Sequence, residues 1–455
     1  MKNVIGAKCI KCGTEFEAGW ETYTCTKCGG ILDIVFDYNY IKRQISQDKI
    51  IEKKDFSMWR YMEFLPVDEG SILCPLRTGW SPLYRASLLG KKLGLSNLYI
   101  KDDGQNPTSS LKDRASGIAV VRAFNAGKSL AGRHATGINT SGRFADGFGI
   151  LACSSTGNAA SSLAGAAASM GLKTVIFVPQ RAPQAKVTQL LIFGATVVSV
   201  KGDYATAFRL SAQAIEKYGW YNRNAAINPY LMEGKKTVSF EIAEQLGLVF
   251  DKKSAFGFIS PDFVAVSVGD GCTIAGVWKG FKDLFEAGLI DKLPRLISVQ
   301  AEGCCPINRA IEHNAPVSMM EENSIADSIA VGIPRNADKA MAAIRESGGI
   351  VVNVSDEEIL AAMRLLGKST GVFGEPAGVA GTAGLIKAVQ QKLIPFDALV
   401  VSIVTGNGLK DINSAQKAAG SNACSVDNAN LSGLIQIEPD INILDEELLK
   451  RRISH

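Results

Sequence analysis

Histidine and long apolar runs are both scarce in this sequence. The 455 residues include only His134, His313 and His455, and none of them stands in a Ser/His/Asp or metal-ligand pattern, so catalysis centred on histidine is not expected. No stretch is apolar for long enough to span a bilayer, and the N-terminus lacks the basic, apolar and small-residue order of a signal peptide. We therefore expect a cytoplasmic protein without a membrane partner.

An excess of charge of one sign is also missing. The formal net charge is +4, and no Lys/Arg-rich block with interleaved aromatic residues occurs, so nucleic acid is not expected as a partner. Hydrophobic residues make up 46% of the chain and charged residues 21%. A chain of this length and composition can bury a substantial core, which predicts two or three globular domains.

The ten cysteines are not spread as a disulfide framework. Four of them form two Cys-x-x-Cys pairs near the N-terminus, and a glycine follows each pair: Cys9, Cys12, Cys25 and Cys28. Four thiolates at this spacing can close a tetrahedral zinc site, which would be structural because no position is left open. Reduced, metal-free thiols are the alternative. The pattern predicts a zinc-ribbon-like module over residues 1–35, a kind of module that also binds nucleic acids or proteins.

A polar, turn-rich run places Lys112 on the first turn of an apolar helix. Asn106-Pro107 ends a strand predicted over residues 97–100, and hydroxyl residues at 108–110 can cap the helix that follows. The positive potential beside a helix N-terminus favours a neutral, nucleophilic amine, which suits Schiff-base chemistry. A solvated first turn is the alternative for such a lysine taken alone.

Short apolar runs alternate with helical patterns along most of the remaining chain. The expected later strands cover residues 149–153, 174–178, 196–200, 263–268, 296–300, 349–354 and 398–404. Strands that alternate with helices in this way are typical of an α/β fold with parallel sheets.

Two strand-to-helix turns carry residues suited to anions. Residues 154–158 read Ser-Ser-Thr-Gly-Asn and offer amides and hydroxyls to a carboxylate. Residues 269–273 read Gly-Asp-Gly-Cys-Thr, and a glycine turn at a helix N-terminus suits a phosphate monoester. The Asp270 carboxylate would repel a phosphate, so we expect its side chain to point away. Either motif alone also fits an ordinary helix cap.

Five segments together resemble one enzyme family. Residues 106–114, Asn-Pro-Thr-Ser-Ser-Leu-Lys-Asp-Arg, resemble the pyridoxal-phosphate lysine segment of the tryptophan-synthase-β-like superfamily (fold type II), specifically of threonine synthases, although Leu111 stands where the family usually has Phe. Four further segments match in the expected order, at 154–158, 268–273, 375–378 and 404–411. The resemblance covers roughly residues 75 to 415.

The resemblance implies a fold and a domain arrangement. We expect a fold-type II pyridoxal-phosphate enzyme with two open, twisted, mainly parallel sheet domains besides the ribbon, assembled as a homodimer. The large cofactor-binding domain would comprise residues 36–119 and 236–420, and the small mobile domain residues 120–235 with an insertion at 129–148. Residues 421–455 would form a C-terminal tail.

The resemblance also implies roles for individual residues. Lys112 would hold pyridoxal phosphate and then move protons, Asn158 would bond its phenolic oxygen, and Thr405 would meet its ring nitrogen. The phosphate of the cofactor would rest on Gly269, Asp270, Gly271, Cys272 and Thr273. Substrate contacts would come from Ser155 and Thr156, for the α-carboxylate, and from Asn228 with Lys235 or Lys236, for a phosphate. Ala159 replaces a hydroxyl that in the family often assists with the substrate phosphate.

The predicted activity is that of a pyridoxal-phosphate-dependent carbon–oxygen lyase. O-Phospho-L-homoserine and water would give L-threonine and phosphate, by elimination of the γ-phosphate and addition of water at Cβ. A related serine or threonine ammonia-lyase, or a β-replacement enzyme such as cysteate synthase, is the alternative within the superfamily. A non-catalytic protein that binds a partner through its zinc ribbon is the alternative from another class.

Overall fold

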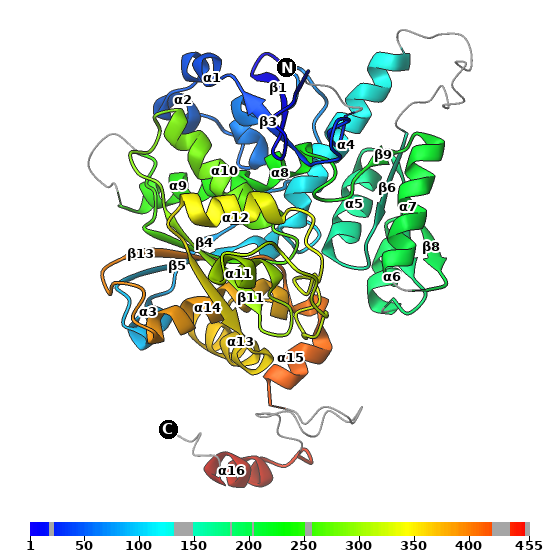
Figure 1. Cartoon of the computed structure of the whole chain (residues 1–455). Coiled ribbons are helices and arrows are strands. Elements are labelled where there is room, and N and C mark those ends of the chain that lie inside the picture. Colours follow the sequence, from blue (N-terminus) through cyan, green and yellow to red (C-terminus); the bar gives the residue numbers. More distant parts are fainter. Residues whose placement is uncertain are drawn as a thin grey trace.

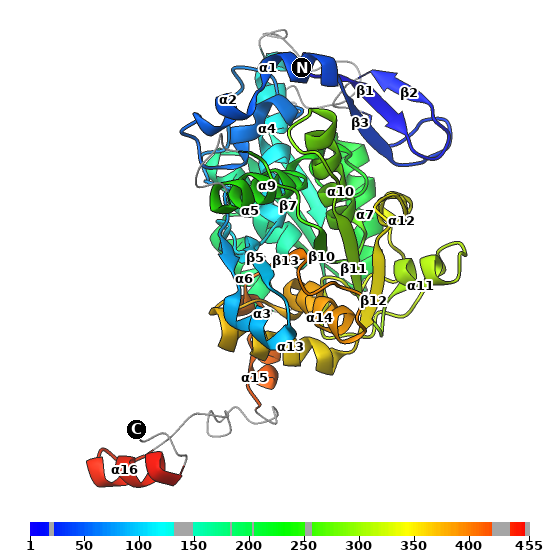
Figure 2. The same cartoon turned by 90° about the vertical axis from the view of Figure 1, so that its left-hand side faces the viewer.

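The structure is a computed structural model that describes residues 1–17, 22–131, 149–182, 184–202, 204–250, 257–420 and 437–450. Most of the predicted insertion (129–148) and much of the predicted tail (421–455) lie outside these residues. One described part of that tail is α16 (Ile441–Lys450), which lies apart from the sheets at the lower end of Figures 1 and 2. Within the described ranges, no helix combines the length and the apolar character needed to cross a membrane.

A six-stranded sheet forms the centre of the molecule (Figure 1). Its strand order is β12-β11-β10-β13-β5-β4, and all neighbouring pairs are parallel except β4 with β5. The strands are β4 (Leu83–Arg85), β5 (Asn97–Asp102), β10 (Phe263–Ser267), β11 (Arg295–Ala301), β12 (Ile350–Val354) and β13 (Leu399–Val404).

Alternating side chains of this sheet feed two separate hydrophobic cores. In β10, Val264 and Val266 join one core, whereas Phe263 and Ala265 join the other, because successive strand residues point to opposite faces. The first face is covered by α8 (Tyr230–Lys235), α9 (Thr237–Phe250), α10 (Cys272–Glu286), α11 (Pro306–Glu312) and α12 (Ala337–Glu346). The second face is covered by α3 (Ser87–Leu93), α13 (Asp356–Thr370), α14 (Pro376–Gln390) and α15 (Ile412–Ala418).

A second, four-stranded sheet is parallel throughout and has the order β8-β7-β6-β9. Its strands are β6 (Ile150–Ser154), β7 (Lys173–Pro179), β8 (Thr196–Val200) and β9 (Tyr221–Asn222). Its helices are α5 (Asn158–Ser169), α6 (Gln184–Ile192) and α7 (Tyr204–Tyr218). This sheet lies to the right of the large one in Figure 1, so the prediction of two open, mainly parallel sheets is confirmed.

The N-terminal residues form a small antiparallel sheet and a helical connector. The sheet has the order β2-β1-β3, from β1 (Val4–Cys9), β2 (Glu15–Glu17) and β3 (Leu32–Phe36). The connector comprises α1 (Tyr38–Gln44), α2 (Gln47–Ile51) and the 3-10 helix η1 (Met58–Phe64). Asp33 on β3 forms ion pairs with Lys279 on α10 and Lys339 on α12, which fix the small sheet to the large domain.

Helix α4 (Lys112–Ala131) runs between the two large sheets and packs against α5 and α8. Its third residue, Arg114, is fully buried and bonds two carboxylates: its Nε lies 2.7 Å from Asp103, and its Nη1 lies 2.5 Å from Glu241. The Lys101 ammonium lies 2.7 Å from the same Glu241 carboxylate. Two cations therefore balance two acids, so the buried charge beneath the N-terminus of α4 is compensated.

We expect Arg114→Met to lower the free energy of unfolding by about 3–5 kcal/mol, because it leaves Asp103 and Glu241 buried with one cation for two carboxylates. Urea unfolding followed by circular dichroism measures the loss. Arg114→Lys keeps the charge but not the paired geometry and should lie between wild type and Arg114→Met. A methionine variant as stable as the wild type would refute the structural role of this network.

Candidate active site

Three neighbouring parallel strands of the large sheet, β5, β13 and β10, end at the same edge, and the loops after them meet there. The loop after β13 pairs directly with the segment that precedes Lys112. The backbone N–H of Leu111 donates to the Thr405 carbonyl at 2.9 Å, and Ser110 forms a bridge with Gly406. Thr405 thereby lies beside Leu111, the residue before Lys112.

Lys112 begins α4, and its amine makes no hydrogen bond or ion pair with any residue that the structure describes. Burial, together with the charges of Lys235 and Arg223, lowers the pKa of Lys112 to about 8. A much larger fraction of this amine is therefore neutral near pH 7.5 than of an ordinary lysine. A neutral amine is the nucleophile that attacks an aldehyde.

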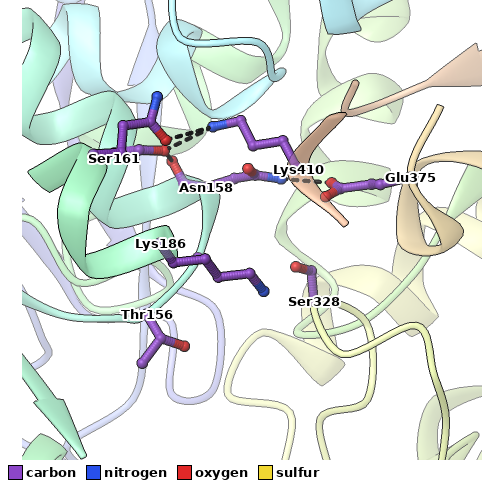
Figure 3. A pocket seen from close by; sticks show the side chains of 9 residues that line it. Thr156, Asn158, Ser161, Lys186, Ser328, Glu375 and Lys410 are labelled. Carbon is purple, nitrogen blue, oxygen red and sulfur yellow. Dashed lines mark hydrogen bonds between the residues drawn. The ribbon is translucent and has the colours of Figure 1, made fainter. Parts of the chain in front are cut away.

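Asn158, the first residue of α5, faces Glu375 across the gap between the two sheets (Figure 3). The Asn158 Nδ2 donates to Glu375 Oε1 at 2.6 Å. Burial and the nearby Asp327 carboxylate raise the pKa of Glu375 to about 7, against the opposing effect of this hydrogen bond. Glu375 can therefore exchange a proton near neutral pH. Asn158, whose amide is predicted to meet the phenolic oxygen of the cofactor, thus donates a hydrogen bond to an acid whose pKa is raised.

Around this pair lies a recess that we name the Lys410 recess (Figure 3). It is lined by Thr156, Gly157, Asn158, Ser161, Lys186, Gln189, Ser328, Glu375 and Lys410. The Lys410 Nζ donates to Ser161 Oγ at 3.0 Å, and Lys186 forms an ion pair with Asp327. The turn predicted to take a carboxylate thus stands beside two cations, which is a suitable setting for an anionic substrate.

The glycine turn at the N-terminus of α10 is shaped for close approach. Gly271 has φ +85°, and a Cβ on it would lie 2.8 Å from the Ala340 side chain. The Oδ1 of Asp270 accepts the backbone N–H of Arg335 at 2.6 Å. Its Oδ2 lies 3.7 Å from the Sγ of Cys272, the first residue of α10, so this carboxylate stays beside the helix start.

A second recess lies beside this helix start, and we name it the Lys235 recess. It is lined by Leu32, Ala225, Ala226, Asn228, Pro229, Leu231, Met232, Lys235, Cys272, Asn336 and Lys339. Lys235 is 2% exposed, and no described residue accepts a hydrogen bond from its ammonium. The Asn336 Nδ2 is likewise buried with no acceptor among the described residues. These free donors beside a helix N-terminus fit a bound phosphate.

These features fit pyridoxal phosphate in its chemistry. A lysine amine with a lowered pKa is available for the aldehyde, and donors without partners are available for the phosphate. Lys112 contributes to both neighbourhoods, because its charge interacts with Cys272 of the Lys235 recess and with Glu375 of the Lys410 recess. The charge of the Lys112 amine is thus influenced by residues of both recesses.

The structure brings most of the predicted site residues together and leaves Lys236 apart from them. Ser155 Oγ accepts the Gly157 N–H at 3.2 Å within the turn beside Asn158. Asn228 lines the Lys235 recess, and its amide bonds the backbone, to Asn222 O and Tyr230 N. Lys236 is buried in an ion pair with Glu233 and Asp283. Of the two lysines considered for a phosphate, only Lys235 faces the site.

Several site residues carried no sequence signal that we used. Glu375 stood in a recognised segment, but its side chain received no role. Lys186 and Lys410 reach the Lys410 recess from elements far apart in sequence, and Arg223 follows β9 without any motif around it. Only the folded arrangement brings Lys186 and Lys410 into one recess and the charge of Arg223 within reach of Lys112.

The lowered pKa of Lys112 predicts how cofactor uptake depends on pH. The rate at which apo-protein takes up pyridoxal phosphate, followed by visible absorbance, should rise about tenfold per pH unit and level off above about pH 8. The sign follows because only the neutral amine attacks. Lys112→Ala should show no covalent uptake at any pH. A midpoint near pH 10.5 would contradict the proposed environment of the amine.

Comparisons with known proteins identify the family of this chain. Residues 75–406 match the family described as pyridoxal-phosphate dependent enzyme. The threonine synthase of Methanocaldococcus jannaschii is 37% identical over 440 residues, covering 96% of this chain and 98% of the relative. The threonine synthase of Methanosarcina acetivorans is 39% identical over 407 residues, covering 89% and 92% respectively.

Solved structures agree with the fold. Threonine deaminase isoform 2 from Solanum lycopersicum superposes with a TM-score of 0.58 at 22% identity, over 78% of this chain and 88% of the other. Maize serine racemase superposes with a TM-score of 0.58 at 19% identity, over 72% and 88%. At these identities the likeness concerns the fold alone, whereas the sequence relatives extend over nearly the whole chain. The chain belongs to the pyridoxal-phosphate dependent enzymes and, within them, to the threonine synthases.

Proposed function

We propose that this protein converts O-phospho-L-homoserine and water to L-threonine and phosphate. The observation that carries the proposal is the setting of Lys112, a lysine of lowered pKa at a helix start between an anion site and a polar recess. The identity with threonine synthases over almost the entire chain supports the choice of substrate.

Pyridoxal phosphate, when bound, supplies the electron sink that makes the Cα proton of an amino acid acidic. Lys112 would hold the cofactor, release it to the substrate amine, and then carry protons at Cα and Cβ of the substrate as a free base. Its pKa of about 8 suits both directions of transfer at neutral pH. Loss of these protons lets the γ-phosphate leave; a proton is then returned to Cγ, water adds at Cβ, and a proton is returned to Cα.

The remaining polar groups orient the reactants. Asn158 and Thr405 would meet the phenolic oxygen and the ring nitrogen, and the neutral Thr405 hydroxyl would not enforce a protonated ring. Ser155 and Thr156 would hold the α-carboxylate at the start of α5, where amide donors are free. Because these residues belong to the small sheet and Lys112 to the helix between the sheets, we propose that substrate binding closes the two sheets together.

No observation favours the alternative functions. The superposed deaminase and racemase support the fold but are too distant to transfer an activity. A non-catalytic ribbon protein would have no reason to keep Lys112 free of partners beside donors that fit a phosphate. Within the superfamily, the chain groups with the threonine synthases.

The decisive assay supplies the purified protein with pyridoxal phosphate and O-phospho-L-homoserine and measures threonine and phosphate together. We expect equal amounts of both products from the wild type and neither from Lys112→Ala, which lacks the amine. Cofactor colour without either product would disprove the substrate but leave the cofactor site intact.

We also propose that a structural zinc ion is bound in the N-terminal module. The four sulfur atoms of Cys9, Cys12, Cys25 and Cys28 lie within 4.8 Å of one another, with Sγ–Sγ distances of 3.4–3.6 Å for three of the pairs. A tetrahedral site with Zn–S bonds of about 2.3 Å has edges of about 3.8 Å, so little movement is needed. The cluster is compact because a Cβ on Gly30 would lie 2.9 Å from the Cys9 sulfur.

If the module binds zinc, we expect one zinc ion per chain and a lower melting temperature after chelation. The metal would join Cys9, the last residue of β1, to the cysteines that precede β3, the strand that pairs with β1. Atomic absorption and calorimetry measure these two quantities. Cys28→Ser should reproduce the loss of metal, whereas Cys74→Ser, a thiol outside the cluster, should keep the metal. Full stability of a metal-free protein would argue for plain thiols. A cytoplasmic location and a homodimer remain predictions.

A further inference from the structure

Glu375 differs from the other buried glutamates in the described part of the chain. Those glutamates are Glu233, Glu241 and Glu244, and each forms an ion pair with a buried lysine or arginine. Glu375 is 5% exposed, yet its carboxylate forms no ion pair with any described cation. Burying a carboxylate without a counter-charge is costly, which points to a use for this one.

Glu375 stands at the start of α14 but does not cap that helix. It precedes Pro376, the first helical residue, at the position where an acidic side chain commonly accepts a backbone N–H of the first turn. The Glu375 side chain makes no such bond. It reaches α5 instead and accepts a hydrogen bond from Asn158 Nδ2 at 2.6 Å (Figure 3). Among the described residues, Asn158 is the one hydrogen-bond partner of this carboxylate.

Gly406 leaves the space in which this pair lies. A Cβ on Gly406 would lie 2.1 Å from Glu375 Oε1 and 3.2 Å from Asn158 Nδ2, so a side chain there would displace the pair. The Gly406 carbonyl also accepts the backbone N–H of Glu375 at 3.0 Å. Gly406 follows Thr405 and forms a bridge with the segment that leads to Lys112. The pair therefore adjoins the part of the site that is predicted to hold the cofactor ring.

Glu375 determines which way the Asn158 amide is turned. An ionised carboxylate can only accept hydrogen bonds, so the nitrogen of the amide, and not its oxygen, must face Glu375. An amide turned the other way would set two oxygen acceptors against each other. The second hydrogen on the Asn158 nitrogen has no acceptor among the described residues. Glu375 thus holds a free N–H donor at the start of α5.

The charged groups around Glu375 leave its bond with Asn158 undisturbed. The charges of Lys410 and Lys186 favour the ionised carboxylate, Asp327 opposes it, and Lys112 also interacts with it. Lys410 donates to side chains of α5 and α6, and Lys186 pairs with Asp327. Neither of these two lysines therefore takes the carboxylate away from Asn158.

We propose that Glu375 is a positioning residue for the cofactor: through Asn158 it presents an N–H donor, rather than a carbonyl oxygen, to the phenolic oxygen of pyridoxal phosphate. The inference deepens the proposed function, because it rests on the cofactor that this function requires. An N–H donor favours the ionised phenol, whereas an amide oxygen would repel it. Glu375 acts through Asn158 and makes no contact with the reacting atoms in this role.

The experiment titrates apo-protein with two ligands by calorimetry. One ligand is pyridoxal phosphate, and the other is 3-deoxypyridoxal phosphate, in which a hydrogen replaces the phenolic hydroxyl. The ratio of their dissociation constants measures the contribution of the phenolic oxygen, because both ligands keep the aldehyde and the phosphate. At about pH 8, above the Glu375 pKa of about 7, the ionised carboxylate prevails. Glu302→Gln, which removes an exposed carboxylate that pairs with Lys387 on α14, is the matched control.

Glu375→Gln keeps the size of the side chain, but its amide can bond either end of the Asn158 amide and so no longer selects one orientation. We expect this variant to reduce the preference for pyridoxal phosphate by about threefold and Glu375→Ala by about tenfold, with affinity for the deoxy ligand unchanged. Asn158→Ala should match Glu375→Ala. In the Asn158→Ala background, neither change at residue 375 should have a further effect, because the two residues act together. Glu302→Gln should match the wild type.

An unchanged preference in both Glu375 variants overturns the proposal, and the glutamine variant decides alone if the alanine variant fails to fold. Equal losses of affinity for the two ligands also overturn it, because they indicate a structural role. A further loss in the Asn158→Ala background overturns it as well, since Glu375 would then act by another route. If the wild type makes no threonine, the proposed substrate fails, whereas these titrations use no substrate and still judge the role of Glu375.

Discussion

The buried pairing of Arg114 with Asp103 and Glu241 is the constraint on which the rest of the structure depends. It joins the residue after β5, the start of α4 and helix α9, and the Lys101–Glu241 pair adds a second ionic link between β5 and α9. The two residues before it have different surroundings. Asp113 accepts the Thr108 N–H at 2.7 Å, and Lys112 is left without a partner among the described residues. In the motif 112–114, Arg114 therefore anchors α4, Asp113 bonds the turn that precedes the helix, and Lys112 presents the nucleophile.

The charges around Lys112 differ from those elsewhere in the interior in how they are paired. Elsewhere in the described interior, each buried cation has its own carboxylate, so the local potential is close to balanced. Around Lys112, the cations Lys235 and Arg223 form no ion pair with a described acid. The pKa of Glu375, which also interacts with Lys112, is raised. The amine thus lies in a positive field that favours its neutral form and attracts anions.

Much of the architecture could be predicted because it depends on local pattern. The strand–helix alternation gave the two parallel sheets, and the turn residues before Lys112 gave the start of α4. The connector after β3 carries Arg60, which pairs with Glu244 on α9. That role depends on a contact between residues 184 positions apart, which no local pattern encodes.

The sequence could predict only those candidate site residues that lie in short contiguous motifs. Lys112, Asn158, the glycine turn and Thr405 each sit in a short recognisable segment. Lys186 and Arg223 do not, and Lys410 stood in the segment 404–411 without a role, because the chemistry of these cations arises only where separate elements meet. Asn228 lines the Lys235 recess, but its amide bonds the backbone of Asn222 and Tyr230, which its segment did not indicate.

The docking of the N-terminal sheet has a consequence for where this enzyme can be divided. Leu32 lines the Lys235 recess, the Phe36 ring lies 3.8 Å from the Lys236 ammonium, and Arg60 neutralises Glu244. A chain trimmed to the family match at residues 75–406 would lose all three and would expose the recess while leaving a buried acid unpaired. Leu32 of the N-terminal sheet is therefore part of the wall of the Lys235 recess, and the connector supplies the cation that pairs with the buried Glu244.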